Sequence, residues 1–217
     1  MLCFGLMVLY LLFGGGMNSS ALEDVHYLHD GFTEGVQDCS FAFMWGMLIA
    51  WYVGIDFANR TVHRSIVTGS SRAVIVLSRF IATSVLTIVF HVVTIIGDLL
   101  VYGMKFGFSL DGFSARDILW FLVVCLQLIA FNAFFNLITF ICGNVYSALV
   151  TSVVIATLGG NVLRNFLGGN FIYEHSFFCF AKSSASADLI PCAICAIVAS
   201  VILVTASIII FTKKDIA

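Results

Sequence analysis

Five polar side chains interrupt long apolar stretches in the middle of the chain. His91 and Asp98 lie seven residues apart in one stretch, which is two turns of an α-helix and therefore nearly one face. Ionisable groups inside a bilayer are costly and often line ion or substrate pathways. Three amides lie in a second stretch: Gln127, Asn132 and Asn136. All five are candidate residues of a translocation path. Snorkelling to water is the alternative for Asp98, and hydrogen bonding between helices is the alternative for the amides.

Residues that could form a catalytic or metal site do not occur in the usual patterns. The sequence contains neither an H-E-x-x-H pair of zinc ligands nor a G-x-x-x-x-G-K-[ST] phosphate loop. Glu23, His26 and His29 have the nearest metal-like spacing, but a solvated polar loop is the simpler interpretation of that segment. We predict no catalytic residues and no metal site. An intramembrane enzyme stays open as an alternative function class.

The seven cysteines do not form a redox framework. Free cysteine behaves as a small apolar side chain and is common in apolar helices. Cys192 and Cys195 form a C-x-x-C pair inside an apolar stretch, without the context of a redox domain. A disulfide between Cys39 and Cys179, which both fall on the predicted outer side, is left open.

Composition predicts the elements that position these residues. The 217 residues are 61% hydrophobic and 10% charged, whereas soluble domains carry about 25% charge. A helix needs about 20 mostly apolar residues to cross a hydrocarbon core of about 30 Å. In lipid, the backbone must also satisfy its own hydrogen bonds. We therefore predict an all-α integral membrane protein, with one transmembrane permease domain over residues 1–217.

Charge-free runs predict six transmembrane helices. The runs cover residues 1–22, 39–55, 80–97 with an extension past Asp98 to about Met104, 118–163 and 189–212. The run 118–163 is about twice the length of one crossing, so it must reverse. Cys142-Gly143-Asn144 is the predicted turn, because Gly and Asn tolerate the backbone angles of a tight reversal. A secretory signal at the start is disfavoured because it lacks a basic n-region.

Basic residues orient the predicted bundle. Arg60, Arg64, Arg72 and Arg79 lie between the second and third spans, and Lys213 and Lys214 lie in the tail. The positive-inside rule assigns these segments, and both termini, to the cytoplasm. Residues 18–38 carry acidic but no basic side chains, as an outer loop can. The longest outer stretch, residues 164–188, is rich in Gly, Phe and Ser, and its Phe171, Phe177, Phe178 and Phe180 are suited to the membrane interface.

The cytoplasmic loop of residues 56–79 has a helical pattern with one interruption. Val62, Ile66 and Val67 recur at helical spacing beside polar residues, which predicts a short amphipathic helix. Gly69 is suited to end it, and Ser70 or Ser71 to cap the next helix, which runs into the third span. The chain therefore makes a cytoplasmic helical elbow between the second and third spans. Such an elbow can lie on anionic lipid or dock on a cytosolic partner.

The elbow resembles the first cytoplasmic loop of ABC-2 type permeases. That loop has the pattern G-T-[IV]-[RK]-x-x-[IL]-x-x-G-x-[ST]-R-x-x-[IV]-x-x-[ST]-[KR] after an acidic residue. The matching residues are Asp56, Thr61, Val62, Ile66, Gly69, Ser71, Arg72, Ile75, Ser78 and Arg79. Arg60 and His63 stand where the family usually has Gly and Arg or Lys. The ending Phe211-Thr212-Lys213-Lys214-Asp215-Ile216 is similar to the F-x-[KR]-[KR]-D-[IL] tail of the family.

The resemblance implies a transport subunit. Such permeases pair with a second permease subunit, as homo- or heterodimers, and sit on ABC ATP-binding subunits whose closure is conveyed through this loop. The implied coupling residues are Asp56, Thr61, Val62, Arg64, Ile66, Gly69, Ser71, Arg72 and Arg79. The resemblance assigns ATP and Mg to the partner ATPase, with no cofactor in this chain. Membrane lipid is a further expected partner, and nucleic acid is not expected.

Arg72 has a particular expected role in that coupling. Its planar fork of donors lies beside a Gly-Ser-Ser turn, and such a fork suits a carboxylate or carbonyl of the partner ATPase. Family members usually begin with a cytosolic helix, whereas Met1 opens directly into the first span. We therefore expect a truncated start or a subunit with altered contacts.

These expectations combine into one function with one further alternative. We expect a multi-pass subunit of a bacterial exporter in the cell membrane, which moves an amphipathic peptide, drug or lipid-like substrate. The apolar, Phe-rich spans suit such cargo without identifying it. A non-transporting immunity or assembly subunit remains the alternative.

Overall fold

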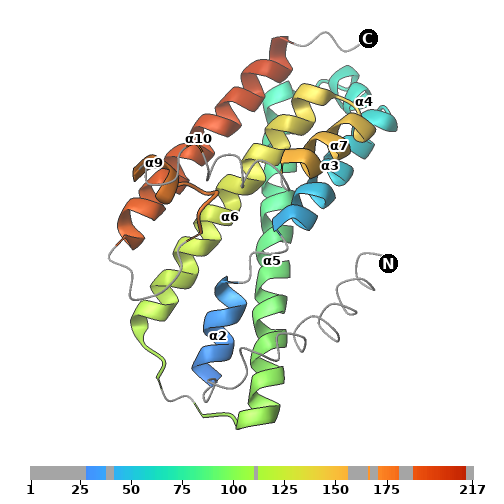
Figure 1. Ribbon diagram of the computed structural model, residues 1–217. Coiled ribbons are helices and arrows are strands. Elements are labelled where there is room, and N and C mark those ends of the chain that lie inside the picture. The colour runs from blue at the N-terminus through green and yellow to red at the C-terminus, as the bar shows by residue number, and fades with distance from the viewer. Residues whose placement is uncertain are drawn as a thin grey trace.

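The computed structural model describes residues 28–37, 42–109, 112–155, 166, 171–180 and 188–213. This described part is helical and contains no strand, and long helices form its centre (Figure 1). The first expected span, residues 1–22, lies outside the described residues, as do Glu23, His26 and Cys39.

Among the described residues, three helices are long and apolar enough to cross a membrane. They are α5 (Arg72–Phe106), α6 (Ala115–Cys142) and α10 (Leu189–Lys213). Helices therefore occupy the third, fourth and sixth expected spans, and α5 continues past Asp98 as predicted. In Figure 1, α6 and α10 run side by side in the same direction, while α5 runs in the opposite one.

Shorter helices occupy the second and fifth expected spans. α3 (Ala42–Ala58) has 17 residues and α7 (Val145–Val154) has 10. At 1.5 Å per residue these are about 25 and 15 Å long, less than the hydrocarbon core of about 30 Å. The described part thus contains three helices of spanning length, and the six expected spans stay a prediction. Two further short helices are α4 (Thr61–Val67) and α9 (Phe171–Glu174).

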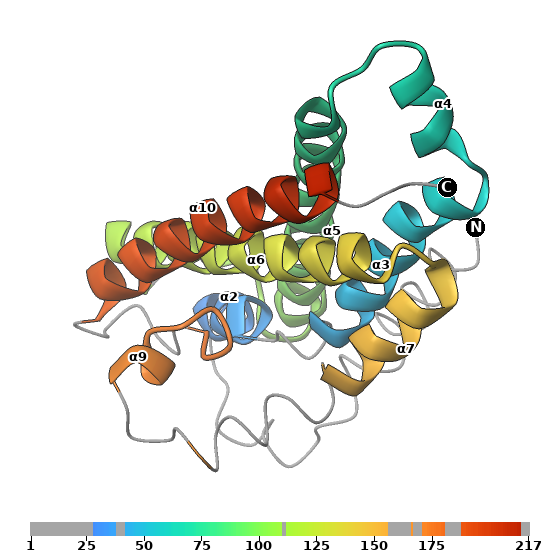
Figure 2. The ribbon, with the colours of Figure 1, turned by 90° about the horizontal axis from the view of Figure 1, so that it is seen from above.

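The predicted reversal at residues 142–144 is confirmed. α6 ends at Cys142, and Gly143 takes the left-handed conformation with φ of 62°, which glycine adopts at little cost. Asn144 then caps α7, because its side-chain oxygen accepts a hydrogen bond from the N–H of Tyr146 at 2.9 Å. The chain turns back, and α7 packs against α3 (Figure 2).

The expected outer loop of residues 18–38 contains a helix, α2 (Leu28–Gln37), so the expectation of a loop is wrong there. α2 packs along α5 through two glycines four residues apart. A Cβ atom on Gly31 would lie 2.7 Å from Cγ of Tyr102, and one on Gly35 would lie 2.9 Å from Oδ2 of Asp98. Small residues at this spacing let two helix backbones approach closely.

A buried carboxylate joins α2 to the start of α6. Oδ2 of Asp117 accepts hydrogen bonds from the backbone N–H and the hydroxyl of Ser114, at 2.7 and 2.8 Å. Nε2 of His29 lies 3.4 Å from the same oxygen. The ring of Phe113 packs edge-on against His29, with centroids 5.3 Å apart. α2 is therefore held by both α5 and α6.

Two hydrophobic clusters fill the space between the helices. The first surrounds the fully buried Trp120 on α6 and includes Val36, Ile95, Val124, Leu128 and Leu189. The second lies where α3, α5, α6 and α10 meet at the elbow end, and it includes Val53, Val62, Val76, Phe135, Phe140 and Phe211. The second cluster is the platform on which the elbow rests.

We predict that Gly31→Ala loosens α2 from α5, because the added Cβ would overlap the Tyr102 ring. Overpacking of this kind costs about 1–3 kcal/mol. The measurement is the rate at which maleimide modifies a Val36→Cys reporter, since Val36 lies on α2 and is fully buried in the first hydrophobic cluster. The rate should rise with Gly31→Ala and stay low with Thr33→Ala, which removes only an intrahelical hydrogen bond. Equal rates in both variants would mean that α2 is not held at Gly31.

Candidate functional site

The elbow of residues 56–79 contains the helix and the turn that its sequence predicts. α4 (Thr61–Val67) ends at Thr68, and Gly69 follows with φ of 95°, a value that favours glycine. The Ser71 side chain then caps α5 by accepting a hydrogen bond from the N–H of Val74 at 3.3 Å. Figure 2 shows α4 as a separate short helix between α3 and α5.

Arg60, just before α4, has an unusual backbone conformation. Its φ of 55° and ψ of 22° are left-handed, and it is the non-glycine residue with positive φ in the described part of the chain. A side chain makes this conformation unfavourable by about 1–2 kcal/mol. ABC-2 permeases, which the elbow resembles, usually have Gly at this position. The backbone geometry at Arg60 is one that glycine would adopt without strain.

The inner face of the elbow packs into the second hydrophobic cluster. Val62 on α4 and Ile75 and Val76 on α5 are buried there, and Ile66 is half-buried against the same cluster. Burial of these aliphatic side chains stabilises the elbow, because it removes apolar surface from water. Val62 and Ile66, two of the expected coupling residues, therefore attach α4 to the bundle and do not face outward.

An ion pair connects the two helices that flank the elbow. Nε of Arg79 on α5 lies 2.7 Å from Oδ2 of Asp56 on α3. Burial raises the pKa of the Asp56 carboxyl group, while the charge of Arg79 and a hydrogen bond from Thr61 act in the opposite direction. Arg79 also donates to the Tyr52 hydroxyl at 3.3 Å and lies over its ring. Asp56 and Arg79 thus hold the ends of α3 and α5 together.

Arg72 is bound to the end of α10 within the same chain. Its Nη1 donates to the carbonyl oxygens of Phe211 and Thr212, at 2.9 and 3.0 Å. Its guanidinium group lies 5.8 Å from the centroid of the Phe211 ring. The last carbonyls of a helix have no intrahelical donors and form its negative end. Arg72 therefore joins the elbow to α10 of its own chain, whereas its expected partner was a carboxylate or carbonyl of a separate ATPase.

The outer face of the elbow is exposed and polar. Thr61, Arg64, Gly69 and Ser71 are all exposed, as are Arg60 and His63. Val67 is 73% exposed, although it is one of the apolar residues that predicted the helix. Nothing lies within 4 Å of the position of a Cβ atom on Gly69. The expected coupling residues thus separate into an inner set that fixes the elbow and an outer set that is free to touch another molecule.

The two ionisable residues of α5 face different helices. His91 is fully buried, and its ring stacks on Phe121 of α6 with centroids 6.1 Å apart. Asp98 is half-buried, and its Oδ2 lies against α2 at Gly35. Their sequence spacing predicted nearly one face, but each contacts a different neighbour.

Asn132 and Asn136 hydrogen-bond α6 to α5. Asn132 donates to the Ser84 hydroxyl at 2.6 Å, and Asn136 donates to the Thr83 hydroxyl at 3.0 Å. Asn136 also donates to the side-chain oxygen of Asn132 at 2.8 Å. All four side chains are buried. This is the interhelical hydrogen bonding that the sequence leaves as the alternative to a path role.

Gln127 supports an irregular segment beside the middle of α6. Its Nε2 donates to the carbonyl oxygens of Ser176 and Cys179, at 3.3 and 3.2 Å. Phe177, Phe178 and Phe180 of the same segment pack on Phe131 and Phe134 of α6. These phenylalanines were expected at the membrane interface. In the structure they cover α6, and Gln127 satisfies two backbone carbonyl groups of their irregular segment.

Cysteine and metal-ligand residues form no assembled site in the described part of the chain. Cys125 and Cys192 are buried free thiols, and Cys142, Cys179 and Cys195 are half-buried free thiols. The possible pairing of Cys39 with Cys179 involves a residue outside the described ranges. No group of three or more His, Cys, Asp or Glu side chains is placed to hold a metal ion among the residues described. His29 of the metal-like spacing faces Asp117.

Sequence reasoning missed three features of the structure. The Gly31-x-x-x-Gly35 spacing on α2 is typical of a close contact between helices. The sequence analysis used only the acidic side chains of this segment. Ser114 followed three residues later by an acidic residue resembles a capping box at the start of α6. The Arg72 contact had no sequence signal, because its partners are 139 and 140 residues away.

We predict that Arg60→Gly raises the free energy of unfolding by about 1 kcal/mol, because glycine relieves the left-handed strain. The matched control is Asn59→Gly, an exposed neighbour without a positive φ. That change should lower stability slightly through added freedom of the unfolded chain. The measurement is the unfolding midpoint of purified protein in detergent. If both glycine variants lose stability equally, the left-handed geometry at Arg60 carries no strain.

We also predict that Asp56 and Arg79 make non-additive contributions to the free energy of unfolding. Arg79→Gln and Asp56→Asn should each lower the free energy of unfolding by about 1–3 kcal/mol, because each leaves a partly buried charge without its partner. The double variant should lose less than the sum of the two single losses. Arg64→Gln, on the exposed face, should change stability by no more than about 0.5 kcal/mol. Additive losses in the double variant would show that the pair does not stabilise the elbow.

Comparison of this chain with protein-family models, with curated proteins and with solved structures found no match. The resemblance to ABC-2 permeases therefore depends on the residues of the elbow and the tail. The helical elbow, its Gly69 turn and its Ser71 cap are the structural features of the described residues that bear on it.

Proposed function

We propose that this chain is the membrane-spanning subunit of an ATP-driven exporter of the ABC-2 type, and that the elbow docks on a separate ATP-binding subunit. The observation that carries the proposal is the two-sided elbow. Its inner face is buried in the helix bundle, and its outer face is exposed, basic and polar. A surface of this kind can bind a partner and pass a displacement on to the bundle.

The contacts of the elbow supply a route for that displacement. The Asp56–Arg79 ion pair joins its two ends to α3 and α5, and Arg72 joins it to the end of α10. Packed elements move as bodies between discrete arrangements rather than deforming continuously. A partner that pulls on α4 would therefore move the ends of three helices together. ATP and Mg would bind the partner subunit.

The backbone conformation at two elbow residues also supports the proposed ABC-2 family. Positive φ occurs at Gly69 and at Arg60, and the family pattern has glycine at both positions. A chain that follows the same path with Arg60 in place of glycine accepts local strain. The proposal includes six spans, a cytoplasmic elbow, both termini inside the cell, and a second permease subunit. The substrate class is an amphipathic peptide, drug or lipid-like molecule.

We predict that the outer face and the turn of the elbow are needed to retain the ATPase. Arg64→Glu reverses an exposed charge, and Gly69→Val is incompatible with the positive φ of the turn. Both should reduce co-purification of an ATP-binding subunit and its ATPase activity in liposomes. Ser70→Val places the same side chain at the neighbouring position, which has no positive φ, and Arg116→Glu reverses a charge at the far end of α6; both should retain the partner.

Two outcomes would overturn the proposal. If the wild-type chain captures no ATP-binding subunit from its native membranes, a non-transporting subunit is favoured. If Gly69→Val and Arg64→Glu both keep full ATPase activity, the elbow is a lipid-facing helix. A lipid role also predicts that Arg60→Gln and Arg64→Gln lower membrane affinity by similar amounts, because each basic residue near anionic lipid contributes about 1 kcal/mol.

A further inference from the structure

We propose that a hollow between α3 and α5 binds one water molecule, held by the hydroxyl groups of Tyr52, Thr83 and Thr87. This hollow, hereafter the α3–α5 hollow, has a volume of about 10 Å³ that is open to the centre of a water molecule. One buried water molecule needs about 10–15 Å³ together with two to four polar partners. The inference does not depend on the proposed transport function.

The polar partners come from both helices that line the α3–α5 hollow. Thr83 and Thr87 on α5 are buried, with 1% and 4% of their surface exposed, and they lie about one helical turn apart on one face. Tyr52 lines the hollow from α3. The rest of the lining is apolar and consists of Leu48, Ile49, Leu86 and Phe90. The three hydroxyl groups are therefore the polar partners that this lining offers to a ligand.

These hydroxyl groups keep hydrogen-bonding capacity that a water molecule would use. The Thr87 hydroxyl donates to the carbonyl oxygen of Thr83 at 2.9 Å, and the Thr83 hydroxyl donates to that of Arg79 at 2.8 Å. Thr83 also accepts from Asn136, so each threonine oxygen can accept one more hydrogen bond. The Tyr52 hydroxyl accepts from Nη1 of Arg79 at 3.3 Å, and its proton has no acceptor among the described residues. Water would accept from Tyr52 and donate to the threonine oxygens.

The charges beside the α3–α5 hollow favour a neutral ligand. The guanidinium group of Arg79, which donates to Tyr52, repels a cation. Oδ2 of Asp56 lies 2.7 Å from Nε of Arg79 and balances its charge, so an anion gains little. A lipid chain would leave the proton of Tyr52 without an acceptor, and a buried donor in that state is unfavourable. Water is the small neutral molecule that both donates and accepts.

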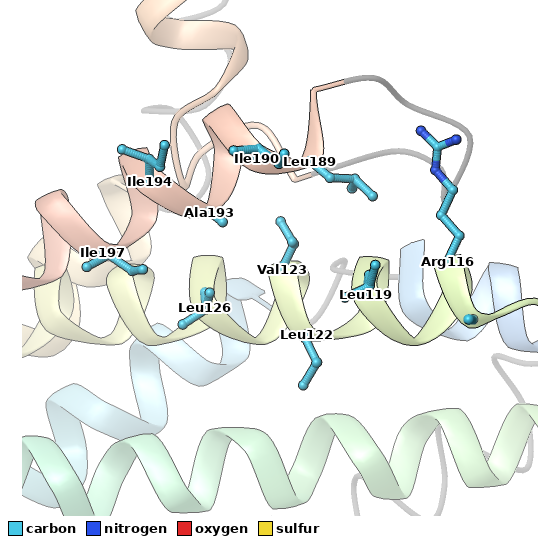
Figure 3. A pocket seen from close by; sticks show the side chains of 11 residues that line it. Arg116, Leu119, Leu122, Val123, Leu126, Leu189, Ile190, Ala193, Ile194 and Ile197 are labelled. Carbon is cyan, nitrogen blue, oxygen red and sulfur yellow. The ribbon is translucent and has the colours of Figure 1, made fainter.

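A larger groove between α6 and α10 provides the contrast. Its volume is about 670 Å³, and none of the described residues that line it carries a hydroxyl group. Leu122 and Leu126 lie along this groove on α6 (Figure 3), and Leu122 is 50% exposed. Such a lining offers a water molecule no side-chain hydroxyl partner. Leu122 therefore serves as a reference leucine that is exposed to the surroundings of the bundle but not to the proposed water.

The experiment is hydroxyl-radical footprinting of the full chain in nanodiscs, read by peptide mass spectrometry. A short X-ray pulse splits water, and the radicals modify side chains next to that water before they diffuse away. We expect Leu48 to be modified several times faster than Leu122 and than Leu128, which is fully buried. Thr87→Val keeps the shape of the side chain and removes one partner of the water. It should lower the modification of Leu48 and Phe90 several times.

Thr94→Val is the matched control. Thr94 is also buried on α5 and donates to the carbonyl oxygen of Phe90 at 2.9 Å, but it is not among the residues that line the α3–α5 hollow. This variant should leave the modification of Leu48 unchanged. Leu128 should stay unreactive in both variants, which shows that the bundle is folded. If Leu128 reacts in Thr87→Val, the decision passes to Tyr52→Phe, which removes the donor and should have the same effect on Leu48.

Two outcomes would overturn the proposal. If Leu48 in the wild-type chain reacts as slowly as Leu122, the hollow is dry or holds a lipid chain. If Thr87→Val and Tyr52→Phe leave the modification of Leu48 as high as Thr94→Val does, the radicals do not come from water held by these hydroxyl groups.

Discussion

A chain this apolar offers its polar groups little water, so they must find partners within the chain. Hydrogen bonds within the helices satisfy most backbone N–H and C=O groups, and side chains bond to some of the remaining ones. Gln127 donates to carbonyl oxygens of an irregular segment, and Asn132 and Asn136 bond α6 to α5. Arg72 does the same for the last carbonyls of α10. The fold is therefore held by aliphatic packing together with a few buried hydrogen bonds that determine which helices are neighbours.

The elbow, where the bundle meets water, is also held by apolar packing together with a few polar contacts. One side of α4 is packed on the second hydrophobic cluster, and the other side is exposed. The Asp56–Arg79 ion pair and the Arg72 contact attach it to three helices. These attachments make the elbow part of the bundle rather than a loose connection. A molecule that binds its outer face would act on α3, α5 and α10 at once.

The two ends of the bundle differ in chemistry. The elbow end presents basic and hydroxyl side chains around α4, whereas the opposite end of α6 and α10 presents a groove whose described lining is aliphatic apart from Arg116. Between them, α5 exposes a continuous aliphatic face and keeps His91 inside. The described helices thus have a basic and polar elbow end, an aliphatic middle and an aliphatic groove at the opposite end.

The sequence by itself determined the local features. Apolar runs predicted α5, α6 and α10, and the Gly143-Asn144 turn and the Gly69-to-Ser71 break followed from backbone and capping preferences that act over a few residues. It did not predict that residues 28–37 form a helix against α5, because the Gly31 and Gly35 contact has meaning only beside Tyr102 and Asp98. Only the tertiary structure decided that Arg72 binds α10, that His91 and Asp98 contact different helices, and that Val62 faces inward. Such contacts join residues far apart in the chain, and they depend on the packing of whole helices rather than on spacing within one of them.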